Sequence, residues 1–141
     1  MFYEQRMTVS DSPGDLRAEY EDDLATIVDR RGPEAVAAET GQERDGLEAL
    51  ARGESPDLTL AEAAEIQALE EGEPDPETIV TIALEHLLLG MSTAVLDVDA
   101  VESKLEIDMD AKEIQQKIEQ RAPMSFEEFV HVQYAIADGA P

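Results

Sequence analysis

Helix-start signals placed ahead of apolar residues spaced by three and four are the strongest constraint on the fold of this chain. Thr59-x-x-Glu62 and Ser125-x-x-Glu128 are capping boxes, in which a hydroxyl and a carboxylate satisfy backbone N–H groups at the beginning of a helix. One helical face over residues 15–31 carries Leu16, Tyr20, Leu24, Ile27 and Val28. These patterns predict an all-α fold of about eight helices.

The expected helices cover residues 15–31, 33–40, 43–52, 60–71, 76–94, 99–105, 111–120 and 126–136. The helix at 76–94 is apolar on most faces, so we expect it in the middle of the core. Within residues 96–110, the segments 96–99 and 105–110 alternate apolar and acidic side chains with period two, which also suits a half-buried β-hairpin. We favour helices for this stretch because of the recurrence described next.

The second half of the chain repeats the order of features found in the first half. The corresponding features are Ala35-Val36 with Ala100-Val101, Leu47 and Ala51 with Ile114 and Ile118, Ser55-Pro56 with Ala122-Pro123, the two capping boxes, and Gln67 with Gln133. We predict two degenerate helix-turn-helix-like repeats around the central apolar helix. An N-terminal extension covers 1–13, the first repeat covers 14–72, and the second covers 73–141 with the central helix, all in one compact unit.

A short helix, a glycine turn and a second helix follow one another in the first half. They are read from Val36-Ala-Ala-Glu-Thr-Gly41, then residues 43–53, then Ser55-Pro56 and an amphipathic helix. This segment resembles the helix-turn-helix domains of phage-repressor type, and the resemblance implies that the helix after Gly41 is the reading helix. The second half has Ile107-Asp108 in place of the turn glycine, and so resembles that motif less.

The charge of the chain is strongly acidic. Among 141 residues, ten Lys or Arg stand against thirty-four Asp or Glu, for a net charge of −24. The carboxylates are dispersed along the chain, which resembles the cytosolic proteins of salt-accumulating haloarchaea. Such a surface repels itself in dilute buffer, whereas salt at about 1 M shortens the Debye length to roughly 3 Å. We therefore expect a folded, salt-adapted protein of the cytoplasm.

Two further segments point to a family. They are LLLGMSTAVLDVD at 87–99 and DAKEIQQKIEQRAPMS at 110–125. On these segments the chain is similar to a small haloarchaeal family of unknown function (domain of unknown function 5791). The resemblance implies a narrow distribution and no known activity.

Two groups of polar side chains are candidates for contact with DNA or a protein partner. The first lies at the predicted reading helix of the first half and comprises Gln42, Arg44 and Arg52, with acidic neighbours. The second lies on the helix at 111–120 and just after it, and comprises Lys112, Gln115, Gln116, Lys117 and Arg121. Gln suits adenine edges and Arg suits guanine edges or phosphates. A continuous cationic face there would favour DNA, whereas a mixed or acidic face would favour a protein.

The remaining residue types exclude several functions. The chain has no cysteine, which rules out disulfides, thiolate metal sites and cysteine nucleophiles. One Glu128-x-x-His131 pair is present, whereas di-iron bundles use two such pairs, and His86 is expected to be packed or at a rim. We find no signal peptide, cofactor motif or catalytic motif and expect no membrane span. We expect a non-catalytic regulatory or interaction protein that binds another protein or itself as a homodimer, with sequence-specific DNA binding as the alternative.

Overall fold

The computed structural model describes residues 1–6 and 8–139, and this part of the chain is all-α with eight helices and no strand. The helices are α1 (Pro13–Arg31), α2 (Pro33–Thr40), α3 (Arg44–Ala51), α4 (Leu60–Gln67), α5 (Pro76–Ala94), α6 (Val98–Lys104), α7 (Ala111–Ile118) and α8 (Phe126–Asp138). The predicted fold class and helix number are confirmed. The hairpin alternative for residues 96–110 is wrong.

Helices form at 96–110 because acidic residues of the period-two pattern act as caps. The Asp97 carboxylate accepts the Ala100 N–H at 2.8 Å and begins α6. The Asp110 carboxylate accepts the Glu113 N–H at 2.8 Å and begins α7. Their alternation with apolar neighbours therefore reflects two helix starts and a connecting loop.

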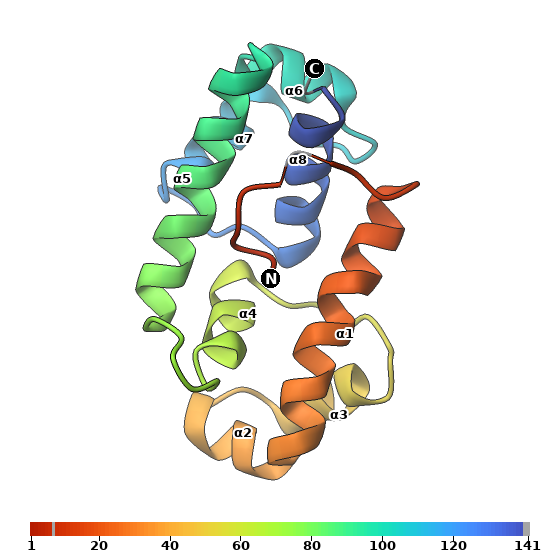
Figure 1. The fold of residues 1–141 in the computed structure, drawn as a ribbon, viewed down its shortest axis with the longest axis vertical. Coiled ribbons are helices and arrows are strands. Elements are labelled where there is room, and N and C mark those ends of the chain that lie inside the picture. The colour runs from red at the N-terminus through yellow and green to blue at the C-terminus, as the bar shows by residue number, and fades with distance from the viewer. Residues whose placement is uncertain (7, 140–141) are drawn as a thin grey trace.

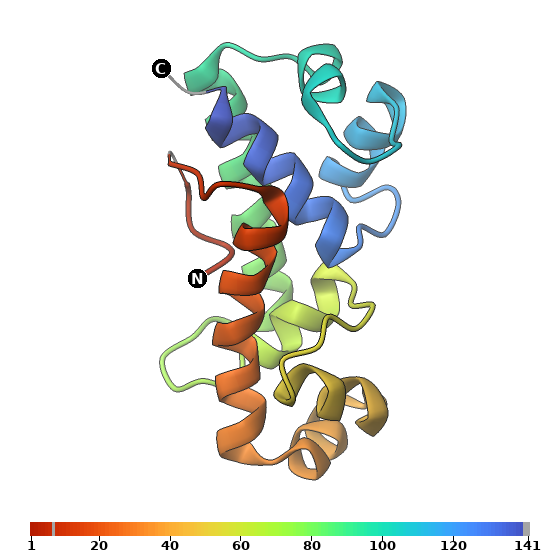
Figure 2. The same ribbon diagram turned by 90° about the vertical axis from the view of Figure 1, so that its right-hand side faces the viewer.

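The two long helices, α1 and α5, run antiparallel along opposite edges of an elongated molecule (Figure 1). α4 and α8 lie between them, and each contacts both long helices. The pair α2–α3 forms one end of the molecule and the pair α6–α7 forms the other, and both pairs project to the same side (Figure 2). Each half of the chain thus has one long helix followed by three shorter ones.

The two capping boxes meet at the centre of the molecule. Thr59 and Ser125 form an antiparallel bridge, in which the Leu60 N–H donates to Met124 O at 2.9 Å and the Phe126 N–H donates to Leu58 O at 2.8 Å. Both boxes are complete, so α4 and α8 begin side by side with their first N–H groups satisfied. This bridge joins the two halves through their backbones.

The first residues of the chain belong to the core. Phe2 is only 2% exposed, and its ring packs edge-on against Phe126 at a centroid distance of 5.4 Å. The backbone of this segment is held by the Gln133 amide, which donates to Phe2 O at 3.0 Å. The Tyr3 hydroxyl donates to Glu73, and burial together with that carboxylate raises the pKa of Tyr3 to about 12. The predicted N-terminal extension, residues 1–13, therefore includes a segment that packs into the core.

Three expectations about single helices were wrong. α5 is not enclosed in the core, because its outer face leaves Leu88 and Leu89 about half exposed. α4 ends at Gln67 instead of residue 71, because the N–H groups of Leu69 and Glu70 bond three residues back instead of four. α7 ends at Ile118 because Gln120 adopts a left-handed φ of 62° that turns the chain.

Candidate interaction site

The first group of predicted contact residues is occupied by contacts within the chain. Arg44 lies 2.7 Å from a carboxylate oxygen of Glu48, and Arg52 lies 2.6 Å from one of Glu54. Gln42 points back toward α4, where its amide donates to the backbone oxygen of Glu62 at 3.0 Å. The resemblance to a reading helix predicted side chains aimed at a partner. This group forms pairs within the chain, and its contact with a partner stays a prediction.

Lys117 is the best-held cation of the second group. Its ammonium lies 2.5 Å from Glu128 and 3.0 Å from Glu113, and its side chain is only 13% exposed. Burial alone would lower the pKa of Lys117, but the hydrogen bonds to Glu128 and Glu113 outweigh burial and raise it. Burial alone has the opposite effect on a carboxylate and would raise the pKa of Glu128. The hydrogen bonds from Lys117 and Ser125 outweigh burial and lower it. Lys117 therefore ties α7 to the start of α8.

The remaining members of the second group lie on a face of mixed charge. Arg121 lies 3.4 Å from Glu119, and the Gln115 amide donates to the same carboxylate at 3.3 Å. Lys112 is exposed, and Gln116 is half-buried. The carboxylates of Glu113 and Glu119 stand among these groups, so the cations do not form a continuous stripe.

This pairing extends through the described part of the chain. Eight of the ten cationic side chains form ion pairs there, namely Arg6, Arg17, Arg30, Arg31, Arg44, Arg52, Lys117 and Arg121. A phosphate would have to compete with a carboxylate of this chain for each of them. Lys104 and Lys112 remain as exposed cations without an ion pair to a described residue.

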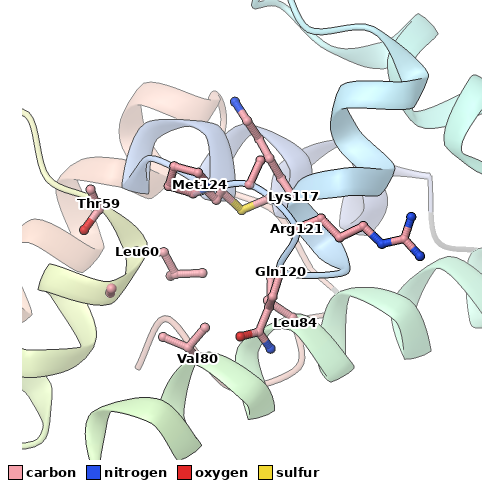
Figure 3. Close-up of a pocket in the computed structure, with 11 residues that line it drawn as sticks. Thr59, Leu60, Val80, Leu84, Lys117, Gln120, Arg121 and Met124 are labelled. Atoms are coloured by element: carbon pink, nitrogen blue, oxygen red, sulfur yellow. The ribbon is translucent and has the colours of Figure 1, made fainter.

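A groove opens beside Lys117, between the start of α4, the middle of α5 and the loop from α7 to α8. It has a volume of about 320 Å³ and is lined by Thr59, Leu60, Ala61, Val80, Leu84, Lys117, Gln120, Arg121, Ala122, Pro123 and Met124. Its lining is mostly apolar. Leu60 and Val80 face the opening, the Gln120 amide points toward α5, and the Arg121 guanidinium points away (Figure 3).

The groove continues along α5. A second hollow of about 470 Å³ lies beyond it, lined by Ala61, Glu65, Pro76, Glu77, Val80, Thr81 and Gln120. The two hollows share Ala61, Val80 and Gln120, which makes one continuous depression between α4 and α5. We call this depression the α4–α5 groove. Only Lys117 and Arg121 among the predicted contact residues border it.

The groove was not predicted from the sequence, because its shape depends on how α7 ends. The Gln120 N–H donates to Lys117 O at 3.2 Å and the Arg121 N–H donates to Gln116 O at 2.8 Å, which is the Schellman arrangement usually built on glycine. In this turn Gln120 leaves the helix and its side chain reaches the groove. The signal available in the sequence was Ala122-Pro123, which marks a nearby turn.

The histidines and carboxylates of residues 1–6 and 8–139 form no metal site. No group of three or more His, Asp or Glu side chains there is placed to hold a metal ion. His86 Nδ1 lies 2.8 Å from Tyr3 O, as suits a histidine at the rim of the core, and His131 lies 4.0 Å from Glu127. No single described helix is long and apolar enough to cross a bilayer; only α5 and α6 together reach that length and composition, across a 92° bend.

The fold and the site define the class as a small, strongly acidic all-α protein with an apolar groove. The chain belongs to the family of unknown function DUF5791, which matches residues 16–139. No curated protein and no solved structure matches it significantly. The matched region begins within α1, so it includes the two capping boxes and the α4–α5 groove and leaves out the buried N-terminal residues.

Proposed function

We propose that this protein is a non-catalytic, salt-adapted interaction module of the haloarchaeal cytoplasm that binds another protein. The observation that carries the proposal is the pairing of its cations. Of the eight side chains expected to meet a partner, Arg44, Arg52, Lys117 and Arg121 are in ion pairs, while Gln42 and Gln115 bond to groups of the chain itself. Phosphate binding requires cations that are free to exchange counterions.

The α4–α5 groove is the proposed contact surface. Side chains such as Leu60, Val80 and Leu84 make its lining mostly apolar, and its polar groups come from Thr59, Lys117, Gln120 and Arg121. Apolar depressions with a polar border are the usual receptors for an apolar side chain of a partner. We propose a partner segment that places such a side chain between α4 and α5.

The helix-turn-helix likeness is retained as part of the proposal. The order of helices is the same in both halves, and the two capping boxes bridge each other, as expected for a duplicated unit. Gly41 ends α2 with a left-handed φ of 78°, as the turn glycine of such a motif would. We therefore propose two degenerate helix-turn-helix-like repeats that have been adapted to protein binding.

Direct DNA binding through α7 is the alternative function. The exposed Lys112, which has no ion pair to a described residue, and Gln115 beside it are the groups that favour it. Such binding would have to operate at high salt, where counterion release contributes little. A gel shift with genomic DNA in multimolar KCl, against a scrambled competitor, should show no enrichment if the main proposal is correct.

The protein-binding proposal is tested by site-specific photocrosslinking in cells at native salt. A photoreactive residue at Ala61, which is exposed in the groove, should give protein adducts. The same residue at Ala38, exposed on α2, is the control and should not give those adducts. Adducts that are the same at both positions, or nucleic-acid adducts alone, would contradict the proposal.

A groove variant gives an independent readout. Ala61→Glu places a carboxylate in the apolar groove, yet Ala61 is the second residue of α4, where the helix dipole favours a negative charge. The variant should therefore fold with unchanged circular dichroism. Recovery of the crosslinked partner with wild-type-like affinity would show that the groove is not the contact surface.

A further inference from the structure

The outer face of α5 becomes uncharged toward its C-terminal end. Residues 87–96 contain no Asp, Glu, Lys, Arg or His, and this is the longest such stretch in the chain. Three large apolar side chains stand out from it, with Leu88 49% exposed, Leu89 50% and Val95 88%. An apolar patch of this kind on an otherwise charged surface marks a contact surface. We call Leu88, Leu89 and Val95 the α5 end patch.

Val95 adds a second observation. It adopts φ 56° and ψ 50° at the end of α5, where its N–H bonds to Ser92 O and the next N–H bonds to Met91 O. Glycine or asparagine normally occupies this left-handed position, and a β-branched residue there is strained by about 1–2 kcal/mol. Because its side chain is almost fully exposed, packing within one chain does not offset the strain.

A hollow lies beside the α5 end patch. It has a volume of about 760 Å³ and is lined by Leu88, Met91, Ser92, Val95, Leu96, Asp97 and Ala100. Leu89 is outside this lining and projects from the same helix. Leu89 directly follows Leu88, a lining residue, so a projecting side chain and a hollow are neighbours on α5. These are the two parts that a symmetric contact between identical surfaces requires.

We propose that two copies of this chain associate symmetrically through their α5 end patches, with Leu89 of each copy entering the hollow of the other. Charge selects this occupant. Each copy has a net charge of −24, so two copies repel each other across carboxylate-bearing faces and approach most closely where charge is sparse. Asp97 is the one charged residue that lines the hollow, and its carboxylate accepts the Ala100 N–H at the start of α6. A cationic partner would instead favour the acidic faces. The inference does not rest on the proposed function, because the α5 end patch and the α4–α5 groove share no residue.

Sedimentation at several protein concentrations in about 2 M KCl, where surface repulsion is screened, tests the proposal. The wild-type chain should sediment as a dimer. Leu89→Glu would bury two like charges at the contact and should raise the dissociation constant on the order of 100-fold or more. Ala38→Glu, the same kind of change at an exposed site on α2, should leave the dimer intact.

Cysteine crosslinking gives a readout that does not depend on stability, because the natural chain has no cysteine. Leu89→Cys or Ser92→Cys should form a disulfide-linked dimer on mild oxidation, whereas Ala38→Cys should not. A wild-type monomer at millimolar concentration, or a dimer that persists in Leu89→Glu, would overturn the proposal. Ala61→Glu should dimerise normally, so a failure of the groove proposal stays distinguishable from a failure of this one.

Discussion

At the scale of single residues, Gly90 shows how closely α5 approaches α8. A Cβ atom added at Gly90 would lie 2.9 Å from Cγ2 of Ile136, which is a buried branched side chain with little room to move. Gly90→Ala should therefore destabilise the protein by about 1–2 kcal/mol, since overpacking outweighs the helix-propensity gain of alanine. Chemical denaturation measures this change.

Gly46 provides the matched control for that substitution. It lies inside α3, and a Cβ there would meet nothing within 4 Å. Gly46→Ala should stabilise the protein by about 0.5–1 kcal/mol through the same propensity term. If both alanine variants change the free energy of unfolding in the same direction, the close contact between α5 and α8 does not determine the effect of Gly90→Ala.

Phe2 is the second residue whose substitution is expected to change the stability of the protein strongly. It contacts Tyr20, Phe126 and Phe129 from a position only two residues into the chain. Phe2→Ala should cost about 3–5 kcal/mol, because it leaves an aromatic-sized cavity between α1 and α8. Tyr3→Phe, which keeps the ring and removes only the hydroxyl, should cost much less. Equal losses in thermal denaturation would mean that the segment is held mainly by its polar contacts.

At the scale of elements, the paired capping boxes are expected to act together. Thr59→Ala and Ser125→Ala each remove a cap and should each cost about 1 kcal/mol. The double variant should deviate from additivity, because the two residues form one backbone bridge and share its geometry. Thr26→Ala, a mid-helix exposed site, is the control. Additive losses within error would show that the bridge transmits no coupling between the halves.

The ion pair between α7 and α8 gives an acid dependence. The folded pKa of Glu128 lies below its ordinary value of about 4.5, so its stabilising contribution is present above that value and is lost as the pH falls through the folded pKa. Glu128→Gln keeps an acceptor for the Ser125 N–H but loses the charge. The wild-type chain should thus exceed it in stability by about 1 kcal/mol near pH 7, and the difference should shrink below about pH 4.5.

A Lys117→Met background separates the ion pair from the cap. There Glu128 has lost its partner, and Glu128→Gln should produce a much smaller pH-dependent difference in the free energy of unfolding. The titrations should use the lowest KCl concentration at which helix content is complete, since salt screens the pair. An unchanged pH dependence in this background would mean that the capping bonds, not Lys117, set the pKa.

Local sequence signals predicted the elements well, because caps and apolar periodicity act over only a few residues. The capping boxes placed the first residues of α4 and α8 correctly. Helix ends were less accurate, since Gln120 takes a left-handed conformation that its residue type does not favour. The α4–α5 groove could not be predicted at all, because Leu60, Val80 and Gln120 meet only through the packing of three helices.

At the scale of the whole molecule, the position of α5 also could not be predicted from local sequence signals. Its composition predicted a central helix, yet it lies along one edge and exposes Leu88 and Leu89 toward its C-terminal end. The apolar composition of a helix predicts that much of its surface will be buried. It does not predict whether the same chain or another copy covers that surface. The buried Phe2 is the converse case, because a short segment outside the periodic pattern fills a place in the core.

The net charge of −24 sets the last prediction, which concerns the salt dependence of the whole fold. Exposed carboxylates without ion pairs to described residues, such as Asp22, Asp23 and Asp29, lie within about two turns of α1 and repel one another in dilute buffer. Helix content measured by circular dichroism should fall in low-salt buffer and return in multimolar KCl, because the Debye length shrinks to a few ångströms. Replacing these three aspartates with asparagine should move the midpoint to lower KCl. Sucrose stabilises compact states without screening charge, so full recovery in sucrose alone would contradict this account.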